Sequence, residues 1–453
     1  MNLVKDDIKK RYYRYLADAF GSSLISTIYG RVDSIVIGKY AGPDGSAARA
    51  VMAPLWNIVF SFGLLFGIGG SVFFSALRGK GKEFKKESNE YFTISILGGI
   101  VFSVFCRIRF FCFDKPIFRA LGADDARLKL CDEYLLPVKF AVPAYLFSQI
   151  LAAFLRNDSN PTLATVAVLI GGIFNVFADF FFVFTLKLGL FGAGLATAIG
   201  NTLSVLLRCI HFFLKKKNTL RIVKPEHFFK KTKDIVSSGF STFVVDAAMG
   251  IVTALRNNQI RKYLGSDALA VYGVIVYRST CVQCCAYSVG QAAQPIFSAN
   301  YGAKQYDRIK ETLIHSIISS IFFALLWTVL RMAIPNGIVK LRRNATDGVL
   351  LIAPRIIRLY SISFLLLPLN IFSTYYFQSI RKPGIALFVS IRRGAVISSI
   401  LIETLPLFRK DLGIWLARPF TEVIIFAVIV YFTIRYTKKR KKSFEVQVIL
   451  PKA

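Results

Sequence analysis

The sequence predicts an all-α polytopic membrane protein, with twelve transmembrane helices in two six-helix bundles related by a pseudo-two-fold axis along the membrane normal. Of the 453 residues, 54% are hydrophobic and the mean hydropathy is +0.52, which is too apolar for a soluble chain of this length. The apolar residues gather in windows of about 20 to 30, enough for a helix to cross a hydrocarbon core of about 30 Å. A membrane barrel would instead show alternating segments of about ten residues. The windows cover approximately 14–40, 50–77, 89–113, 132–155, 162–185, 190–214, 235–263, 267–297, 312–335, 350–378, 384–408 and 412–436.

The two halves of the chain repeat each other. Ser75-Ala76-Leu-Arg-Gly79 recurs as Ser298-Ala299-Asn-Tyr-Gly302, and Pro161 and Pro383 open the fifth and eleventh windows at nearly the same separation. Because each unit has an even number of helices, both enter and leave on one side, so the repeat axis lies along the membrane normal. The expected parts are an N-terminal bundle (1–214), a cytoplasmic linker (215–234), a C-terminal bundle (235–437) and a basic cytoplasmic tail (438–453).

The net charge of +32 is interpreted loop by loop. Lysine and arginine are dense at the N-terminus, in the second and sixth loops and in the tail, which lie on one side of a twelve-helix protein. The positive-inside rule therefore places both termini in the cytoplasm and the protein in the plasma (cell inner) membrane. A nucleic-acid partner is not expected.

The sequence contains few signs of catalytic or metal chemistry. It has no Walker phosphate loop, so transport must draw on an ion gradient. Cys281-Val-Gln-Cys284 has the spacing of redox and zinc sites but lies in an apolar window without a second cluster. A membrane enzyme such as an acyltransferase is disfavoured, because we expect no histidine to be paired with a carboxylate at a membrane face. We expect no enzyme activity, no cofactor and no structural metal.

Two acids lie inside apolar windows, Asp33 in the first and Asp179 in the fifth. An ionised side chain at this depth costs a few kcal/mol or more, so such an acid normally faces the bundle interior and handles protons or cations. Asn175 precedes Asp179 by one helical turn and shares its face. Counted along their windows, the acids lie about 19 and about 17 residues from the cytoplasmic start, so they are expected at similar depth.

Structural alternatives exist for both acids. Asp33 could pair with Arg31 or Lys39 near the interface and serve only to cap a helix. Asp179 could form an inter-helix hydrogen bond that only holds the bundle together.

The second half has its own candidates. Asp246 lies midway along the seventh window, where it either handles cations or pairs with Arg256 or Arg278. Glu403 and Glu422 are weaker candidates because each is expected near a membrane face.

Several motifs together resemble the multidrug and toxic compound extrusion (MATE) family, part of a superfamily that also contains polysaccharide and lipid-precursor flippases. The resemblance covers almost the whole chain. The motifs are Val-Asp33-Ser-Ile-Val-Ile-Gly, Met-Ala-Pro54, Leu-Arg156-Asn-Asp-Ser-Asn-Pro161, Asn175-x-x-x-Asp179, Gly192-Ala-Gly-Leu-Ala-Thr-Ala-Ile-Gly200, Gly239-Phe-Ser-Thr-Phe, Ala-Val-Tyr-Gly273, Gln294-Pro295 and Asn300-Tyr-Gly302-Ala.

The resemblance implies a V-shaped pair of bundles that alternates between outward-open and inward-open states. It assigns Asp33, Asn175 and Asp179 to a cation-coupling site that takes H+ or Na+, with the Ser204 hydroxyl nearby. It also implies an acid in the seventh helix, here Asp246, and a counterpart for Arg278. The acid that some relatives carry in the tenth helix is absent, which favours protons over sodium ions.

The expected function is secondary active antiport: export of amphipathic, cationic organic compounds, as in multidrug efflux, in exchange for protons or sodium ions. The alternative within membrane transport is a flippase for a lipid-linked oligosaccharide or precursor, in which Arg256 and Arg278 would point into the cavity to bind a pyrophosphate. Small organic cations and the lipid bilayer are the expected partners, and a monomer is the expected state. The sequence does not identify the substrate.

Overall fold

The computed structural model describes residues 3–121, 124–214, 218–335 and 347–449, and these ranges consist of helices joined by turns and non-helical segments, without a strand. The first helix, α1 (Ile8–Lys80), has 73 residues and a break at Gly42, where φ is 61° and ψ is −144°. Such backbone angles are open almost only to glycine, and Pro43 follows as the first residue of a new helical run. Gly42 and Pro43 thus end one membrane pass and begin the next.

The other helices match the predicted windows closely. Eleven helices in the described residues are long and apolar enough to cross a membrane, and α1 supplies two passes, which confirms the predicted fold class with twelve passes. The remaining elements of the first half are α2 (Lys85–Cys112), α3 (Asp114–Ala120), α4 (Asp125–Asn157), α5 (Pro161–Phe180), the π-helical turn η2 (Phe181–Thr185) and α6 (Gly189–Cys209).

The second half begins with α7 (Phe228–Tyr263). This helix starts inside the stretch 215–234 that the sequence analysis predicts to be a linker. Two predicted single windows are built from more than one element, since α11 and α12 form the tenth pass and α13, η5 and α14 form the eleventh. The elements are α8 (Gly265–Gly302), α9 (Tyr306–Ala333), α11 (Asp347–Ser361), α12 (Leu367–Ser379), α13 (Pro383–Ile391), the π-helical turn η5 (Arg392–Val396), α14 (Ile397–Phe408) and α15 (Lys410–Ile449).

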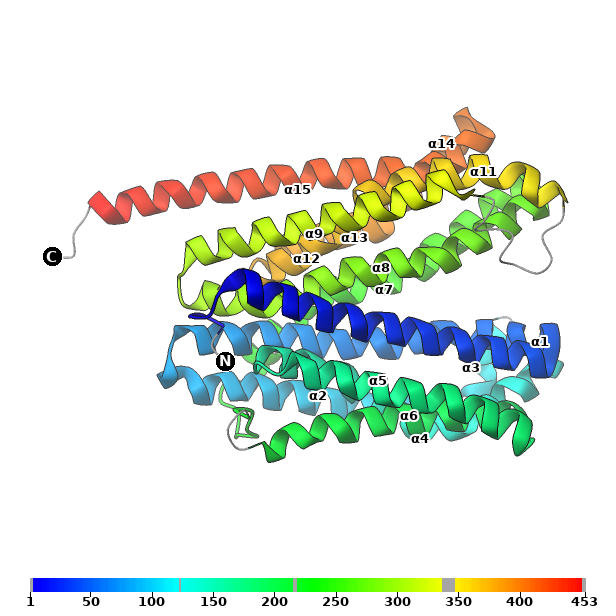
Figure 1. The fold of residues 1–453 in the computed structure, drawn as a ribbon, viewed down its shortest axis with the longest axis horizontal. Helices are drawn as coiled ribbons and strands as arrows, with labels where there is room; N and C mark the ends of the chain where they lie inside the picture. Colours follow the sequence, from blue (N-terminus) through cyan, green and yellow to red (C-terminus); the bar gives the residue numbers. More distant parts are fainter. Residues whose placement is uncertain (1–2, 122–123, 215–217, 336–346, 450–453) are drawn as a thin grey trace.

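Figure 1 shows the helices of the first half together in the lower part of the view and those of the second half above them. α1 lies at the boundary, against α7 and α8. Its buried side chains belong to the cores of both halves: Val36 packs with the first half, and Ile68 and Tyr12 pack with the second. The start of α1 and the end of α15 lie at the same end of the molecule (Figure 1), as an even number of passes requires.

The repeated Ser-Ala motifs meet at this boundary. A side chain at Gly79 would overlap the carbonyl oxygen of Ala299, and one at Gly302 would overlap that of Ala76. The two contacts are reciprocal, since Gly79 and Ala76 in one motif correspond to Gly302 and Ala299 in the other. The Ser75 hydroxyl adds a hydrogen bond of 3.2 Å to the carbonyl of Pro295. The two halves therefore touch backbone to backbone about a local two-fold axis.

Candidate cation-coupling site

Asp33 is buried and held by two partners. The Arg49 Nε donates to Asp33 Oδ2 at 2.8 Å, and the Tyr134 hydroxyl donates to the same oxygen at 3.3 Å. The Arg49 guanidinium also lies 5.8 Å from the centre of the Tyr134 ring. Because α1 turns back at Gly42, Arg49 of the second pass faces Asp33 of the first. The sequence alternatives for Asp33 were therefore wrong about the partner, since neither Arg31 nor Lys39 pairs with it.

A chain of hydrogen bonds leads from Asp33 to the fifth pass. The hydroxyls of Tyr134 and Thr197 are 3.4 Å apart, and Asn175 Nδ2 donates to Thr197 Oγ1 at 3.3 Å. Asp33, Arg49, Tyr134 and Thr197 line one cavity of about 150 Å³ between α1, α4 and α6. The structure thus brings Asp33 and Asn175 into one polar network.

Asp179 lies one turn beyond Asn175, and its side chain is completely buried. Neither carboxylate oxygen has a hydrogen-bond partner among the described residues. Asn175, one helical turn before Asp179, is joined to Asp33 through Thr197 and Tyr134, so the two predicted acids lie at the two ends of one polar network. The π-helical turn η2 follows within two residues, and such turns inside membrane helices are frequent at functional sites.

Ser204 lies beside this network, and its hydroxyl forms a hydrogen bond to the backbone of α5. Its hydroxyl donates to the carbonyl of Ala167 at 2.9 Å, which joins α6 to α5. Ser204 and Asn175 line a small adjoining cavity of about 20 Å³.

The site has the oxygens that a proton or a hard cation requires. Asp33 Oδ1, Asn175 Oδ1 and both oxygens of Asp179 lack a hydrogen-bond donor in the described part of the chain. Oxygen ligands suit sodium ions, although no group of three His, Cys, Asp or Glu side chains able to hold a metal occurs among the described residues. Arg49 places a fixed positive charge next to these oxygens, which opposes the binding of a proton and of a metal cation alike.

The expectation that no histidine is paired with a carboxylate was wrong, since His211 Nε2 lies 2.7 Å from Oδ2 of Asp158. The sequence analysis also missed Arg49, Tyr134 and Thr197. Arg49 stands just ahead of the second apolar window, where nothing in the local sequence distinguishes it from an ordinary loop charge. The signal that could have identified it is the Gly42-Pro43 break, because a hairpin at this point brings the residues on its two sides together.

The structure describes the side chains of only some of the candidate site residues predicted in the second half. The side chains of Asp246 and Arg278 lie outside the described residues. Glu403 accepts a hydrogen bond from Gln259. Glu422, expected near a membrane face, is instead fully buried and forms ion pairs of 3.0 Å with both Arg393 and Arg418.

The MatE family model matches residues 19–181 and 235–402 of this chain. The chain belongs to this family. It is therefore a MATE family membrane transporter and not an enzyme, as the sequence motifs predicted.

Relatives and solved structures agree with this assignment. Multidrug export protein MepA of Staphylococcus haemolyticus is 27% identical over 399 residues, covering 87% of this chain and 86% of MepA. MepA of Staphylococcus aureus strain MSSA476 is 25% identical over 397 residues, with the same shares of 87% and 86%.

The fold matches known MATE structures. An outward-facing multidrug resistance MATE family transporter of the MOP superfamily superposes with a TM-score of 0.89 at 18% identity, covering 97% of this chain and 98% of that chain. A MOP superfamily transporter from Pyrococcus furiosus, described as having a binding pocket of reverse polarity that suggests a different function, has a TM-score of 0.88 at 19% identity, covering 96% and 97%.

Proposed function

We propose that this MATE family transporter is a multidrug exporter that moves amphipathic organic cations out of the cell in exchange for protons, with sodium ions as the alternative coupling ion. The naming of MepA as a multidrug export protein supports the substrate class. The basic loops support cytoplasmic termini in the plasma membrane, and the boundary between the halves supports domains at 1–214 and 235–437 joined by 215–234. We expect the monomer to be the working unit.

The observation that carries this proposal is the Asp179 carboxylate, which is fully buried without a hydrogen-bond donor among the described residues. A lone ionised carboxylate in such a place is strongly unfavourable, so the group must hold a proton or a cation. Transport can use this requirement, because release of the proton leaves a charge that only another cation can neutralise.

Asp33 has a different role in this proposal. Arg49 and Tyr134 hold one of its oxygens, so Asp33 stays ionised while Asp179 gains and loses the proton. The network through Tyr134, Thr197 and Asn175 links the two acids, so a change of charge at Asp179 alters the packing of α1 against α4 and α6. A shift of α1 would open the molecule on one side and close it on the other.

The test uses the purified transporter in proteoliposomes, with ethidium efflux followed under separately imposed pH and sodium gradients. Asp179→Asn should abolish efflux, because an amide does not exchange protons, while the thermal unfolding temperature stays near that of the wild type. Asp125→Asn is the control, since Asp125 is an exposed acid whose side chain is 89% accessible. Retained efflux by Asp179→Asn would refute this coupling role, and efflux driven by sodium alone would refute proton coupling.

A lipid-linked precursor flippase is the second candidate, favoured by one observation. Arg256 lines a cavity in the second half, as a pyrophosphate site would require. This hypothesis predicts that the same proteoliposomes scramble a pyrophosphate-linked lipid and do not export ethidium.

A further inference from the structure

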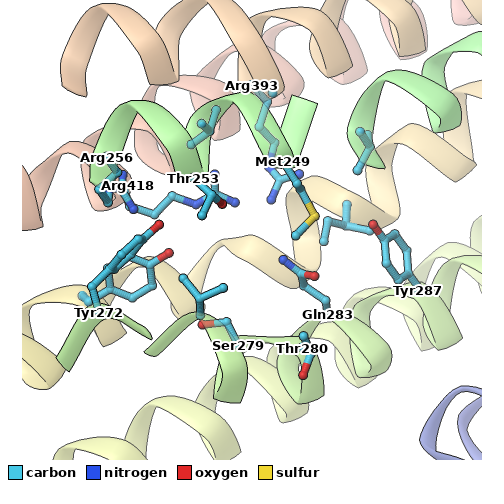
Figure 2. Close-up of a pocket in the computed structure, with 16 residues that line it drawn as sticks. Met249, Thr253, Arg256, Tyr272, Ser279, Thr280, Gln283, Tyr287, Arg393 and Arg418 are labelled. Carbon is cyan, nitrogen blue, oxygen red and sulfur yellow. The ribbon is translucent and has the colours of Figure 1, made fainter. Parts of the chain in front are cut away.

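A second cavity lies within the second half of the molecule, away from Asp33 and Asp179. It encloses about 70 Å³ between α7, α8, α11, η5 and α15. Three arginines line it, each from a different helix: Arg256 from α7, Arg393 from η5 and Arg418 from α15. Figure 2 shows Arg256 and Arg418 close to the ring of Tyr272, and Arg393 entering beside Met249.

Among the described residues, the positive charge of this cavity is incompletely balanced. Glu422 neutralises one charge, because both Arg393 and Arg418 pair with this single carboxylate at 3.0 Å. Arg256 is 1% exposed and forms no ion pair with a described residue. Its guanidinium packs against the rings of Tyr272 at 5.6 Å and Tyr360 at 5.4 Å, and its Nε and Nη2 have no hydrogen-bond partner in the described ranges.

A buried guanidinium with free N–H groups is unfavourable unless an acceptor reaches it. The preferred partner is a planar carboxylate or a phosphate, which binds two N–H groups at once. Gln283 also lines the cavity, and its side-chain amide can donate a further hydrogen bond to a carboxylate. The cavity has room for about five water molecules, which suffices for a carboxylate group but not for a whole drug-sized molecule.

The cavity also borders the first half of the molecule. Thr280 lines it and accepts a hydrogen bond of 2.9 Å from Nη2 of Arg31, which belongs to α1. A compound held between the halves could therefore place one charged group in this cavity while its apolar body stays outside.

We propose that this arginine cavity in the second half binds the carboxylate group of those organic substrates that carry one. This inference rests on the proposed export function for its biological meaning, but binding can be measured independently of transport. Arg256, which has no ion-pair partner among the described residues and two N–H-bearing nitrogens without an acceptor there, is the residue that recognises the carboxylate. Arg393 and Arg418, anchored by Glu422, supply the surrounding positive potential.

The test compares tetramethylrhodamine, which carries a free carboxylate, with its methyl ester, which lacks that charge. Binding of each dye to the full-length chain in lipid nanodiscs is followed by fluorescence polarisation. Arg256→Gln should weaken binding of the free acid by about tenfold or more and leave the ester unaffected. Arg331→Gln is the matched control, because Arg331 is also a buried arginine packed on an aromatic ring, that of Phe364, but does not line the cavity.

A second variant protects the test against misfolding of Arg256→Gln. Thr253→Glu keeps all three arginines and adds a carboxylate to the cavity lining, so it should also reject the free acid selectively. Equal loss of both dyes in both variants, or loss in neither, would overturn the proposal, as would a wild-type protein that binds only the ester.

Separate arms identify the kind of anion. In one outcome, chloride or inorganic pyrophosphate displaces the free acid but not the ester, and this displacement is lost in Arg256→Gln. That result would assign the cavity to inorganic anions or phosphate groups and overturn the carboxylate assignment. Absence of such displacement supports it. Export of the ester from proteoliposomes is measured in parallel: failure there contradicts the proposed efflux function, whereas normal ester export without free-acid binding contradicts only this inference.

Discussion

At the scale of single residues, the buried charged side chains form two groups: those with an oppositely charged partner and those without one among the described residues. Asp33 and Arg49 form a close pair whose side chains are 3% and 22% exposed. Asp179 and Arg256 are buried without such partners among the described residues. We expect the paired side chains to stabilise the fold and the others to bind the transported ion or a substrate.

The Asp33–Arg49 pair should behave as one unit. Arg49→Gln leaves the Asp33 charge buried with only Tyr134 as partner, and we expect it to destabilise the protein by about 3 kcal/mol. The double variant Asp33→Asn/Arg49→Gln removes both charges, so most of this stability should return. Thermal unfolding in detergent measures both effects. Arg119→Gln is the control, because Arg119 forms an exposed pair with Asp125, and it should change stability by less than about 1 kcal/mol. If the effects of Asp33→Asn and Arg49→Gln on stability were additive, the pair would not be coupled.

At the scale of elements, the break in α1 decides which residues meet. A helix of 73 residues would be far longer than a membrane is thick, and Gly42 divides it into two antiparallel passes. Only this reversal brings Arg49 back to Asp33. The π-helical turns η2 and η5 have a comparable effect in the fifth and eleventh passes, where they lie next to Asp179 and contain Arg393.

Substitution at the α1 break should be unfavourable through the backbone alone. A Cβ at Gly42 would meet no atom within 4 Å, but the φ of +61° strains any residue with a side chain. Gly42→Ala should therefore lower stability by about 1–3 kcal/mol and reduce efflux. Gly250→Ala is the control, because its Cβ is equally free and its φ is not positive, so it should be neutral or stabilise α7 by up to about 1 kcal/mol. Equal unfolding temperatures for the two variants would contradict this account of the break.

At the scale of the whole molecule, the two halves meet through reciprocal contacts of their repeated motifs. Gly79 and Gly302 each lie against a backbone carbonyl of the other half. Asn157 and Gln294 also exchange two hydrogen bonds across the boundary, of 2.9 Å and 3.2 Å. Contacts of this kind hold the two halves together at the end of the molecule where α1 and α8 end.

A methyl group at Gly302 should shift the equilibrium from the state in which this end of the molecule is closed toward the state in which it is open. Gly302→Ala would push a Cβ into the carbonyl oxygen of Ala76, so we expect the halves to separate at this end. Labelling of an introduced Ser75→Cys thiol by a water-soluble maleimide should then rise several-fold, and ethidium efflux should fall. Gly384→Ala is the control, since its Cβ would have open space. Unchanged labelling in Gly302→Ala would show that this contact does not hold the end closed.

The sequence by itself determined the fold class, the number of passes and the family, because each follows from local patterns: apolar windows, a repeated motif and several short family motifs. It also identified Asp33 and Asp179, since an acid in an apolar window is conspicuous. Only the tertiary structure decided that Asp33 pairs with Arg49, that Asp179 has no hydrogen-bond partner in the described chain, and that Glu422 sits between two arginines. These properties depend on which helices pack together and how each is rotated, and contacts between distant segments leave no trace in the spacing of residues along the chain.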